Sequence, residues 1–588
     1  MHPRPPTTSR LANLAAQAIR EGFSEYRRRF RALTAASVVS FERRDWAQSR
    51  GDSQARLALY RQVVDAVEER VRGVLGERGN DRVVWVGCKA VYSGLIAERQ
   101  DWDIAETFFN SITRRVFRTV GVDPLIEFVD TDFDAPPTTS RTRCFKRYEA
   151  TKGPRFLFER VLIDRTHSIN WDDLRRDATL IVERLSALLG ADSLDDPLAA
   201  ELLRPIFYRG KGAYVVGRLL TTDDEAEPGL PFALALRNGP SGLFVDAALL
   251  GESEVSDLFC FTRSYFHVDT PRPHDLVRFL AQLLPSRTRG ELYISMGHPK
   301  QGKTELYRDV LAALETTDAQ FVHAPGVKGL VMVVFLLPGL DLVFKVIRDR
   351  FPPNKPTSAA KVKDRYRWVY THDRAGRLVD AQPFEHLQLP LDRFSPALLD
   401  ELFEECGRSA RVESGDLILG LAYVEARVRP LDLYLREVDE QTARAAVLDF
   451  GEAIRDMAAC NIFPGDMLCK NFGVTDQGRV AFYDYDELTE LTTCRFREIP
   501  EARNEEDELR AEPWFSVGPD DVFPEEFPRF LGFDRSQRKL FRDRHGDLFE
   551  ADWWRGVQRR VRDGKIVEFS PFHPDRRLPV PREGGSGS

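Results

Sequence analysis

Three polar residues in the last third of the chain have the types and the spacing that phosphoryl transfer requires. Asp466 precedes Asn471 by five residues and Asp484 by eighteen, within the strings PGDMLCKNFG and RVAFYDYDE. Phosphoryl transfer from Mg-ATP to a hydroxyl needs a carboxylate that accepts the proton, an amide oxygen for the metal, and a second carboxylate that bridges metal and phosphates. The three residues match these roles in that order, at the spacing typical of protein kinases.

Residues upstream of this set are expected to bind ATP. Lys345 lies in the apolar stretch VFKVI, where a buried ammonium is costly unless an anion such as a nucleotide phosphate compensates it. A weak glycine loop precedes it and predicts backbone contacts to phosphate. The loop residues are Ala324, Pro325, Gly326, Val327, Lys328 and Gly329. Further on, VEARVRPLDLYL has the pattern of a hinge strand that runs into a helix, so the backbone of Glu425, Ala426 and Arg427 is available to an adenine edge.

The pattern departs from that of ordinary protein kinases. The catalytic loop has PGD where His-Arg-Asp is usual, the metal-binding segment has DYD where Asp-Phe-Gly is usual, and no Ala-Pro-Glu follows. The helix predicted over residues 359–370 contains no glutamate to pair with Lys345, so the acidic partner of that lysine is unassigned. The sequence therefore predicts an atypical kinase.

A second phosphate-binding pattern leaves an alternative open. Residues 297–304, GHPKQGKT, match G-x-x-x-x-G-K-T, follow the strand-like ELYISM and precede a helical segment, which is the setting of a P-loop. In that interpretation Lys303 reaches the phosphates and Thr304 binds Mg²⁺. A P-loop ATPase is the alternative function, although the strands predicted upstream are antiparallel. A pseudokinase binding module is a third hypothesis, against which the intact catalytic set argues.

Composition restricts the classes of protein that remain. The chain has 588 residues, 43% hydrophobic and 30% charged, as is typical of a globular protein of roughly two to four domains. Its 84 basic and 92 acidic residues give a net charge of -8, which provides no basic field for nucleic acid. Seven cysteines without a C-x-x-C pair predict reduced thiols. With no stretch apolar and long enough to cross a bilayer, we expect a cytoplasmic protein without membrane contact.

Hydrophobic periodicity indicates two domains of different character. Apolar residues recur at helical spacing from residue 11 to about residue 200, and short strand-like runs over residues 208–270 predict a small antiparallel sheet. Further on, strands come first and helices later, which predicts an α+β lobe pair. We expect a mainly helical domain over residues 1–310 and a catalytic domain over residues 311–583, followed by an artificial linker, GGSGS, over residues 584–588.

The strings that carry the site resemble those of one known family. APGVKGLVMVVFLLPGLDLVFKVIRDRFPPNK, NIFPGDMLCKNFGV and RVAFYDYDE are similar to segments of the bacterial isocitrate dehydrogenase kinase/phosphatases, and the chain length also fits. The resemblance implies an atypical two-lobed protein-kinase-like domain preceded by a mainly helical regulatory domain that responds to AMP. It further implies that the enzyme phosphorylates and inactivates NADP-dependent isocitrate dehydrogenase on an active-site serine and also removes that phosphate. Control of the flux between the tricarboxylic acid cycle and the glyoxylate bypass is the expected consequence.

The resemblance also implies a role for each site residue. Lys345 is the expected ATP lysine, Asp466 the catalytic base, and Asn471 and Asp484 the Mg²⁺ ligands, with Mn²⁺ as an alternative metal. Asp484 and the additional carboxylate Asp486 complete the catalytic group. We expect dephosphorylation to use the kinase site, with Asp486 activating water or accepting phosphate while ADP and Mg²⁺ hold the site closed. The implied cofactors are ATP or ADP, Mg²⁺, and AMP as an allosteric effector.

The expected partner is the dehydrogenase itself, and a homodimer is left open. An acidic segment over about residues 488–533 is expected to reach the dehydrogenase, because the target serine lies in a concave site that a flat surface could not enter. The sequence does not locate the AMP pocket, and a role for GHPKQGKT in binding this nucleotide stays open.

Overall fold

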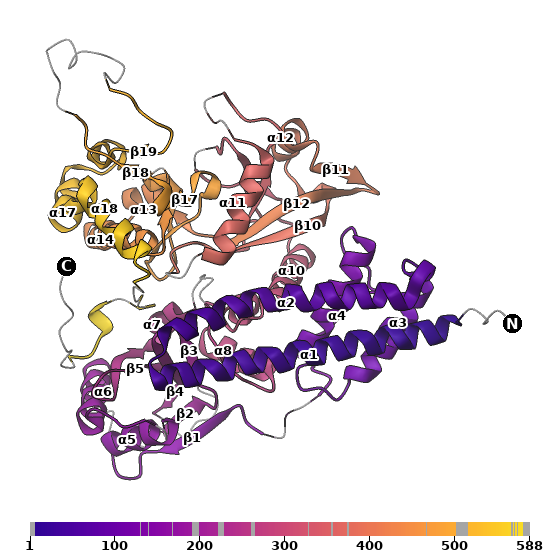
Figure 1. Ribbon diagram of the computed structural model, residues 1–588, viewed down its shortest axis with the longest axis horizontal. Coiled ribbons are helices and arrows are strands. Elements are labelled where there is room, and N and C mark those ends of the chain that lie inside the picture. The colour runs from indigo at the N-terminus through magenta and orange to yellow at the C-terminus, as the bar shows by residue number, and fades with distance from the viewer. Residues whose placement is uncertain are drawn as a thin grey trace. The chain divides into compact units, whose positions relative to one another are not determined.

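The computed structural model in Figure 1 divides into two compact units. The first comprises Met1–Cys260, Tyr265–Thr316 and Ser570–Ser588, and the second comprises Phe261–Ser264 and Thr317–Phe569. Within these units the structure describes residues 6–129, 131–138, 140, 142–166, 169–190, 199–221, 229–259, 265–326, 328–353, 355, 357–372, 376–465, 467–500, 515–565, 569, 571–572 and 574–579. No helix in this described part is long and apolar enough to cross a membrane.

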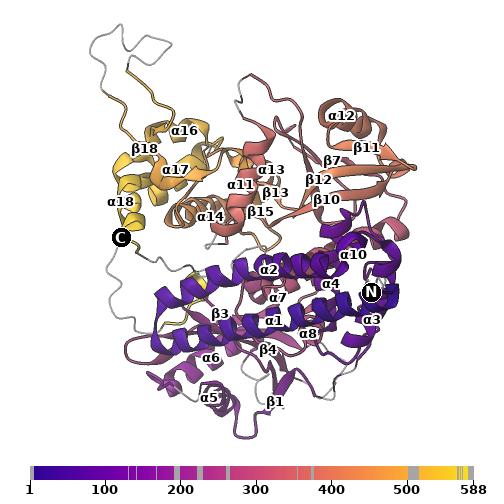
Figure 2. The same cartoon turned by 45° about the vertical axis from the view of Figure 1, so that its right-hand side comes forward.

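Long helices open the first unit. They are α1 (Thr8–Arg43), α2 (Trp46–Leu75), α3 (Arg82–Ile96) and α4 (Trp102–Phe117). The side chain of Asp45 caps α2 by accepting a hydrogen bond from the backbone of Gln48. Figure 1 and Figure 2 both show α1 and α2 side by side, and Gly22 on α1 permits this, because a Cβ at that position would lie 2.1 Å from Val67 Cγ2. These helices confirm the predicted helical start of the chain.

An antiparallel sheet completes the first unit, as predicted. Its strands follow the order β1-β2-β4-β5-β6, with β3 paired to β4. They are β1 (Phe145–Glu149), β2 (Ala199–Leu203), β3 (Phe207–Arg209), β4 (Gly212–Leu220), β5 (Leu230–Asn238) and β6 (Leu243–Leu250). Alternate residues serve two cores: Val215 packs with α5 (Pro154–Arg165) and α6 (Leu174–Leu189), whereas Val216 packs into the core formed by α1 to α4.

The string GHPKQGKT is helical, which overturns the P-loop alternative. Short helices α7 (Gly251–Ser256) and α8 (Pro273–Leu283) precede it, and ELYISM lies mainly in α9 (Arg289–Ser295), which a capping box between Thr288 and Glu291 begins. All but the first two residues of the string lie in α10 (Pro299–Thr316). The Gly302 backbone N–H donates to the carbonyl of His298. A P-loop needs backbone N–H groups free to bind phosphate after a strand, so the hypothesis was wrong.

The second unit begins with a six-stranded antiparallel sheet. The strand order is β10-β12-β9-β8-β7, with β11 paired to β12. The strands are β7 (Val322–His323), β8 (Met332–Leu336), β9 (Leu342–Ile347), β10 (Ala381–Pro390), β11 (Ala410–Glu413) and β12 (Asp416–Ala426). The helices of this lobe are α11 (Ala359–His372) and α12 (Pro396–Cys406). Most side chains of β9 are buried because this strand lies in the middle of the sheet.

A mainly helical lobe follows the sheet. Its helices are α13 (Leu431–Glu437), α14 (Glu440–Ala459), α16 (Phe527–Phe530), α17 (Arg535–His545) and α18 (Ala551–Arg562). Short strand pairs connect them: β13 (Arg429–Pro430) with β15 (Phe472–Val474) and β16 (Val480–Phe482), β14 (Ile462–Phe463) with β17 (Thr489–Glu490), and β18 (Arg495–Phe496) with β19 (Asp521–Val522). The order of strands first and helices later confirms the predicted α+β class.

The C-terminal segment packs into the first unit. Phe572 is 2% exposed within the core that α1 to α4 form, and the Leu578 backbone N–H donates to the carbonyl of Asp246. The sequence analysis assigned the chain to the catalytic domain as far as residue 583, so this return differs from the expectation. The described part of this segment buries Phe572 and Leu578 and forms an isolated bridge between Ala247 and Arg577, a pattern too short for periodicity to detect.

Candidate active site

Lys345 lies at the centre of the sheet in the second unit. Its strand β9 lies between β8 and β12, where Lys345 faces Val334 and Tyr423 in register. Only 6% of the residue is exposed. The Nζ atom lies 2.7 Å from Glu425 Oε2 and donates a hydrogen bond of 2.8 Å to the carbonyl of Tyr483. Glu425 is therefore the acidic partner of Lys345, which could not be assigned from the sequence.

Glu425 enters the site through its side chain. It is 3% exposed and comes from β12, two residues along from the position that faces Lys345. Burial raises the pKa of Glu425 above its ordinary value, and the positive charge of Lys345 opposes that rise. The Tyr366 hydroxyl of α11 donates to Glu425 Oε1 at 3.5 Å, so this helix contributes a tyrosine where ordinary kinases contribute a glutamate.

A backbone connection joins Lys345 to the expected metal ligands. The carbonyl of Tyr483 accepts from Lys345, and the N–H of the same residue donates to the carbonyl of Asn471 at 3.1 Å. The hairpin of β15 and β16 produces this contact by pairing Phe472 with Phe482. Asn471 and Asp484 consequently lie at neighbouring strand ends, and the structure brings both close to Lys345.

The segment DYD presents two carboxylates on either side of a buried ring. Tyr485 is fully buried and its hydroxyl donates to the carbonyl of Val379, which leaves Asp484 and Asp486 on the partly exposed side. Burial and the neighbouring Asp486 carboxylate raise the pKa of Asp484 to about 8. A cation bound beside Asp484 would offset this effect and favour the ionised form of its carboxylate. The carboxylate of Asp484 and the amide oxygen of Asn471 are hard oxygen donors, the type of ligand that suits Mg²⁺.

The predicted phosphate loop is fixed to the same sheet. The Ala324 N–H donates to the carbonyl of Val334, and Gly326 has a φ of 115°, a conformation that only glycine adopts readily. Lys328 Nζ lies 2.9 Å from the Glu401 carboxylate of α12. The carbonyl of Gly329 accepts a hydrogen bond from an arginine that follows β9. The loop therefore precedes the β8–β9 hairpin that carries Lys345.

Four further residues were predicted for the site: Asp466, Val327, Ala426 and Arg427. Asp466 and Val327 lie outside the residues that the structure describes. In the expected hinge, Ala426 pairs with Leu342, and the N–H of Arg427 donates to the carbonyl of Asp341 at 2.9 Å. Contact between this backbone and an adenine edge stays a prediction.

Two side chains that contact the predicted residues were not predicted from the sequence. One is the side chain of Glu425. The other is Lys355, whose Nζ contacts Glu487 and lies 3.4 Å from Asp486 Oδ2. A signal existed for the first, because a buried lysine requires a buried acid nearby and Glu425 lies in an apolar stretch that was itself predicted to be a strand.

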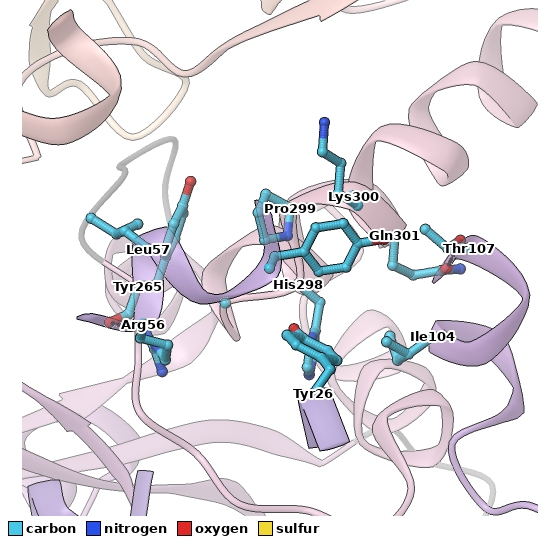
Figure 3. A pocket seen from close by; sticks show the side chains of 12 residues that line it. Tyr26, Arg56, Leu57, Ile104, Thr107, Tyr265, His298, Pro299, Lys300 and Gln301 are labelled. Carbon is cyan, nitrogen blue, oxygen red and sulfur yellow. Dashed lines mark hydrogen bonds between the residues drawn. The ribbon is translucent and has the colours of Figure 1, made fainter. Parts of the chain in front are cut away.

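A separate hollow lies within the first unit. About 460 Å³ of space lies between its lining residues, a volume that includes space open to solvent. Figure 3 shows Tyr26, Ile104, His298 and Gln301 around it, with Arg56 and Tyr265 to one side. Tyr60 also lines the hollow, as do the first five residues of GHPKQGKT.

His298 is the polar group of this hollow that most needs a partner. It is 4% exposed, and its ring stacks on Phe30 with centroids 4.9 Å apart. Among the described residues, Nδ1 has no hydrogen-bond partner. Burial and the positive charges of Arg27 and Arg56 hold the pKa of His298 well below its ordinary value. A neutral imidazole beside tyrosine rings and cationic side chains can bind a polar aromatic ligand.

Similarity to known proteins covers nearly the whole chain. Residues 16–318 match the family described as isocitrate dehydrogenase kinase/phosphatase (AceK), regulatory domain, and residues 319–574 match the kinase domain of the same family. The chain is 47% identical over 571 residues to the isocitrate dehydrogenase kinase/phosphatase of Anaeromyxobacter sp. (strain Fw109-5), covering 97% of this chain and 98% of the relative. It is 43% identical over 582 residues to that of Xanthomonas axonopodis pv. citri, covering 98% and 100%. The corresponding protein of Pectobacterium atrosepticum is 41% identical over 578 residues, covering 97% and 96%.

Proposed function

The chain belongs to the isocitrate dehydrogenase kinase/phosphatase family, and on that premise we propose that it phosphorylates isocitrate dehydrogenase with ATP and also removes that phosphate. The observation that carries the proposal is the buried pair of Lys345 and Glu425, which the backbone of Tyr483 connects to Asn471 and to the adjoining Asp484. The intact pair supports catalysis over a pseudokinase binding role, because a buried ion pair between a lysine and a glutamate has no evident use in a site that does not bind phosphate.

In the kinase direction, a serine hydroxyl of the dehydrogenase attacks the γ-phosphorus of ATP. The bond from that phosphorus to the bridging oxygen breaks and ADP leaves. Asp466 accepts the hydroxyl proton, and Lys345 stabilises charge on the phosphate oxygens. Asn471 and Asp484 would hold Mg²⁺, which neutralises the negative charge that accumulates during transfer.

In the phosphatase direction, the same site hydrolyses the phosphoserine. Asp486 accepts a proton from water as the water oxygen attacks phosphorus, the bond from phosphorus to the serine oxygen breaks, and that oxygen takes up a proton. Bound ADP keeps the site closed. The two carboxylates of the DYD segment thereby have different roles: Asp484 binds the metal and Asp486 accepts the proton from water.

Phosphorylation of an active-site serine inactivates the dehydrogenase, and removal of that phosphate restores its activity. The proposal therefore places the chain at the division of carbon between the tricarboxylic acid cycle and the glyoxylate bypass, in the cytoplasm. The acidic segment over about residues 488–533 is the proposed contact with the dehydrogenase.

AMP is the proposed effector of the first unit. The hollow in Figure 3 supports this proposal, because tyrosine rings suit an adenine face, Arg56 and Lys300 suit a phosphate, and the unpaired Nδ1 of His298 suits a purine edge. In this proposal the first residues of GHPKQGKT bind the regulatory nucleotide, and Lys303 takes no part in phosphoryl transfer.

The test is transfer of labelled γ-phosphate from Mg-ATP to purified NADP-dependent isocitrate dehydrogenase. Wild type, Lys345→Ala and Lys303→Ala are compared, and label release is then followed after adding AMP and ADP. The proposal expects transfer to be lost only with Lys345→Ala, and label to be released once the nucleotides are added. ATP hydrolysis without transfer to the dehydrogenase would overturn it.

A further inference from the structure

Lys355 contacts the carboxylates that follow β16, although it comes from a different part of the chain. It lies ten residues after Lys345, in the loop between β9 and α11. Its Nζ atom contacts Glu487 and lies 3.4 Å from Asp486 Oδ2. Its side chain is 23% exposed and that of Asp486 is 11% exposed, so solvent screens the pair only in part.

The loop that carries Lys355 is held at both ends. Before it, β9 is the central strand of the sheet. After it, Tyr366 of α11 packs its ring against Tyr423 with centroids 3.9 Å apart and against Tyr485 at 5.0 Å. Because Tyr485 immediately precedes Asp486, the packing of α11 fixes the loop against the carboxylates that Lys355 meets.

The two lysines of the site have separate partners. Lys345 pairs with Glu425, whereas Lys355 pairs with Asp486 and Glu487. Although burial favours the neutral amine, the hydrogen bond to Glu487 and the nearby charges of Asp486 and Asp484 raise the pKa of Lys355 above its ordinary value, so the group stays cationic. Three carboxylates within four residues would otherwise repel one another.

We propose that Lys355 is a positioning residue that holds Oδ2 of Asp486 and so fixes the orientation of this carboxylate for hydrolysis of the phosphoserine. The inference rests on the proposed function, in which Asp486 accepts a proton from water. It predicts that removal of phosphate depends on Lys355 more strongly than addition of phosphate, because transfer from ATP relies on Asp466 and Asp484 instead.

The experiment measures kcat and KM in both directions on the full chain, with isocitrate dehydrogenase and its phosphorylated form as substrates. The variants are Lys355→Met, Lys355→Arg and Asp486→Asn, and the control is Lys363→Met, which removes an exposed lysine of α11. For Lys355→Met we expect kcat of phosphate release to fall about tenfold, with KM for the phosphoprotein and the transfer rate changed by no more than about twofold. Lys355→Arg should restore most of the rate because it keeps the cation.

A double variant tests whether Lys355 acts through Asp486. Adding Lys355→Met to Asp486→Asn should not lower the residual rate of label release any further, since the carboxylate that Lys355 positions is already gone. The inference would be overturned if Lys355→Met and Lys355→Arg each lowered the rates of phosphate transfer and phosphate release equally. It would also be overturned if Lys355→Met lowered the rate of phosphate release further in the Asp486→Asn background. A wild-type chain that transfers no phosphate to the dehydrogenase would instead overturn the proposed function, so the two failures are distinguishable.

Discussion

Lys345 and Glu425 form an ion pair between two neighbouring strands, with a separation of 2.7 Å and almost complete burial of both side chains. In ordinary protein kinases the corresponding lysine pairs with a glutamate on a mobile helix, and movement of that helix controls activity. Here β9 and β12 hold both partners in one sheet. The geometry of this lysine is therefore set by the register of the two strands.

Removing the carboxylate of this pair should destabilise the chain. Glu425→Gln leaves a buried ammonium without its counter-ion, and we expect the free energy of unfolding of the second unit to fall by about 3 kcal/mol, measured by urea denaturation. The double variant Lys345→Met with Glu425→Leu should recover most of the stability while remaining inactive in phosphate transfer. Equal stability of Glu425→Gln and wild type would contradict a buried pair.

Asp486→Ala should separate the two activities. We expect release of label from phosphorylated isocitrate dehydrogenase to fall by about a hundredfold or more, because the group that accepts the proton from water is gone. Transfer from ATP should persist, since Asp484 still binds the metal. Asp484→Ala is the matched comparison and should abolish both directions. If Asp486→Ala removes both activities equally, the proposed division of labour is wrong.

The stability of the first unit should depend on pH through Glu106. Burial raises the pKa of Glu106 from 4.5 to about 7, although the Thr131 hydroxyl donates to it and favours the ionised form. A raised pKa contributes stability that is complete below pH 4.5 and is lost as pH rises through 7. Glu106→Gln should therefore become more stable relative to wild type between pH 5 and pH 8, as read from paired melting curves. A constant difference across this range would contradict the shift.

A glycine at the contact of α1 with α2 should resist substitution. A Cβ at Gly22 would lie 2.1 Å from Val67 Cγ2, so we expect Gly22→Ala to lower the free energy of unfolding by about 1 to 3 kcal/mol. Gly73→Ala on α2 is the control, because no atom lies within 4 Å of its added methyl, and it should raise stability by about 0.5 to 1 kcal/mol. Truncating Val67 to alanine should rescue Gly22→Ala.

Residue spacing indicated the candidate site, whereas the contacts that support it are tertiary. The prediction of Lys345, Asn471 and Asp484 rests on spacing, because catalytic chemistry constrains residue types over short stretches, and the structure connects them through the backbone of Tyr483. Glu425 was considered only for its backbone, since its contact with Lys345 depends on a strand register set across 80 residues of chain. Lys355 was missed for the same reason, as the loop contact with Asp486 is purely tertiary.

The fold was predicted where periodicity extends over long segments. The first helices and the two sheets follow the pattern of apolar residues, but ELYISM was wrongly taken as a strand. A short apolar run does not distinguish strand from helix, and the capping box at Thr288 decides the outcome. That capping signal was present in the sequence and outweighs the weak alternation.

The return of Phe572 to the core of the first unit has a consequence for how the chain is made. Because the second unit is inserted within the sequence of the first, a ribosome must release nearly the whole polypeptide before the first core can close. A fragment that ends at Thr316 would lack this ring and leave a gap in that core. The second unit is therefore an insertion in the first. Replacing either unit with that of a relative would require two junctions in the sequence, whereas domains joined end to end require a single junction.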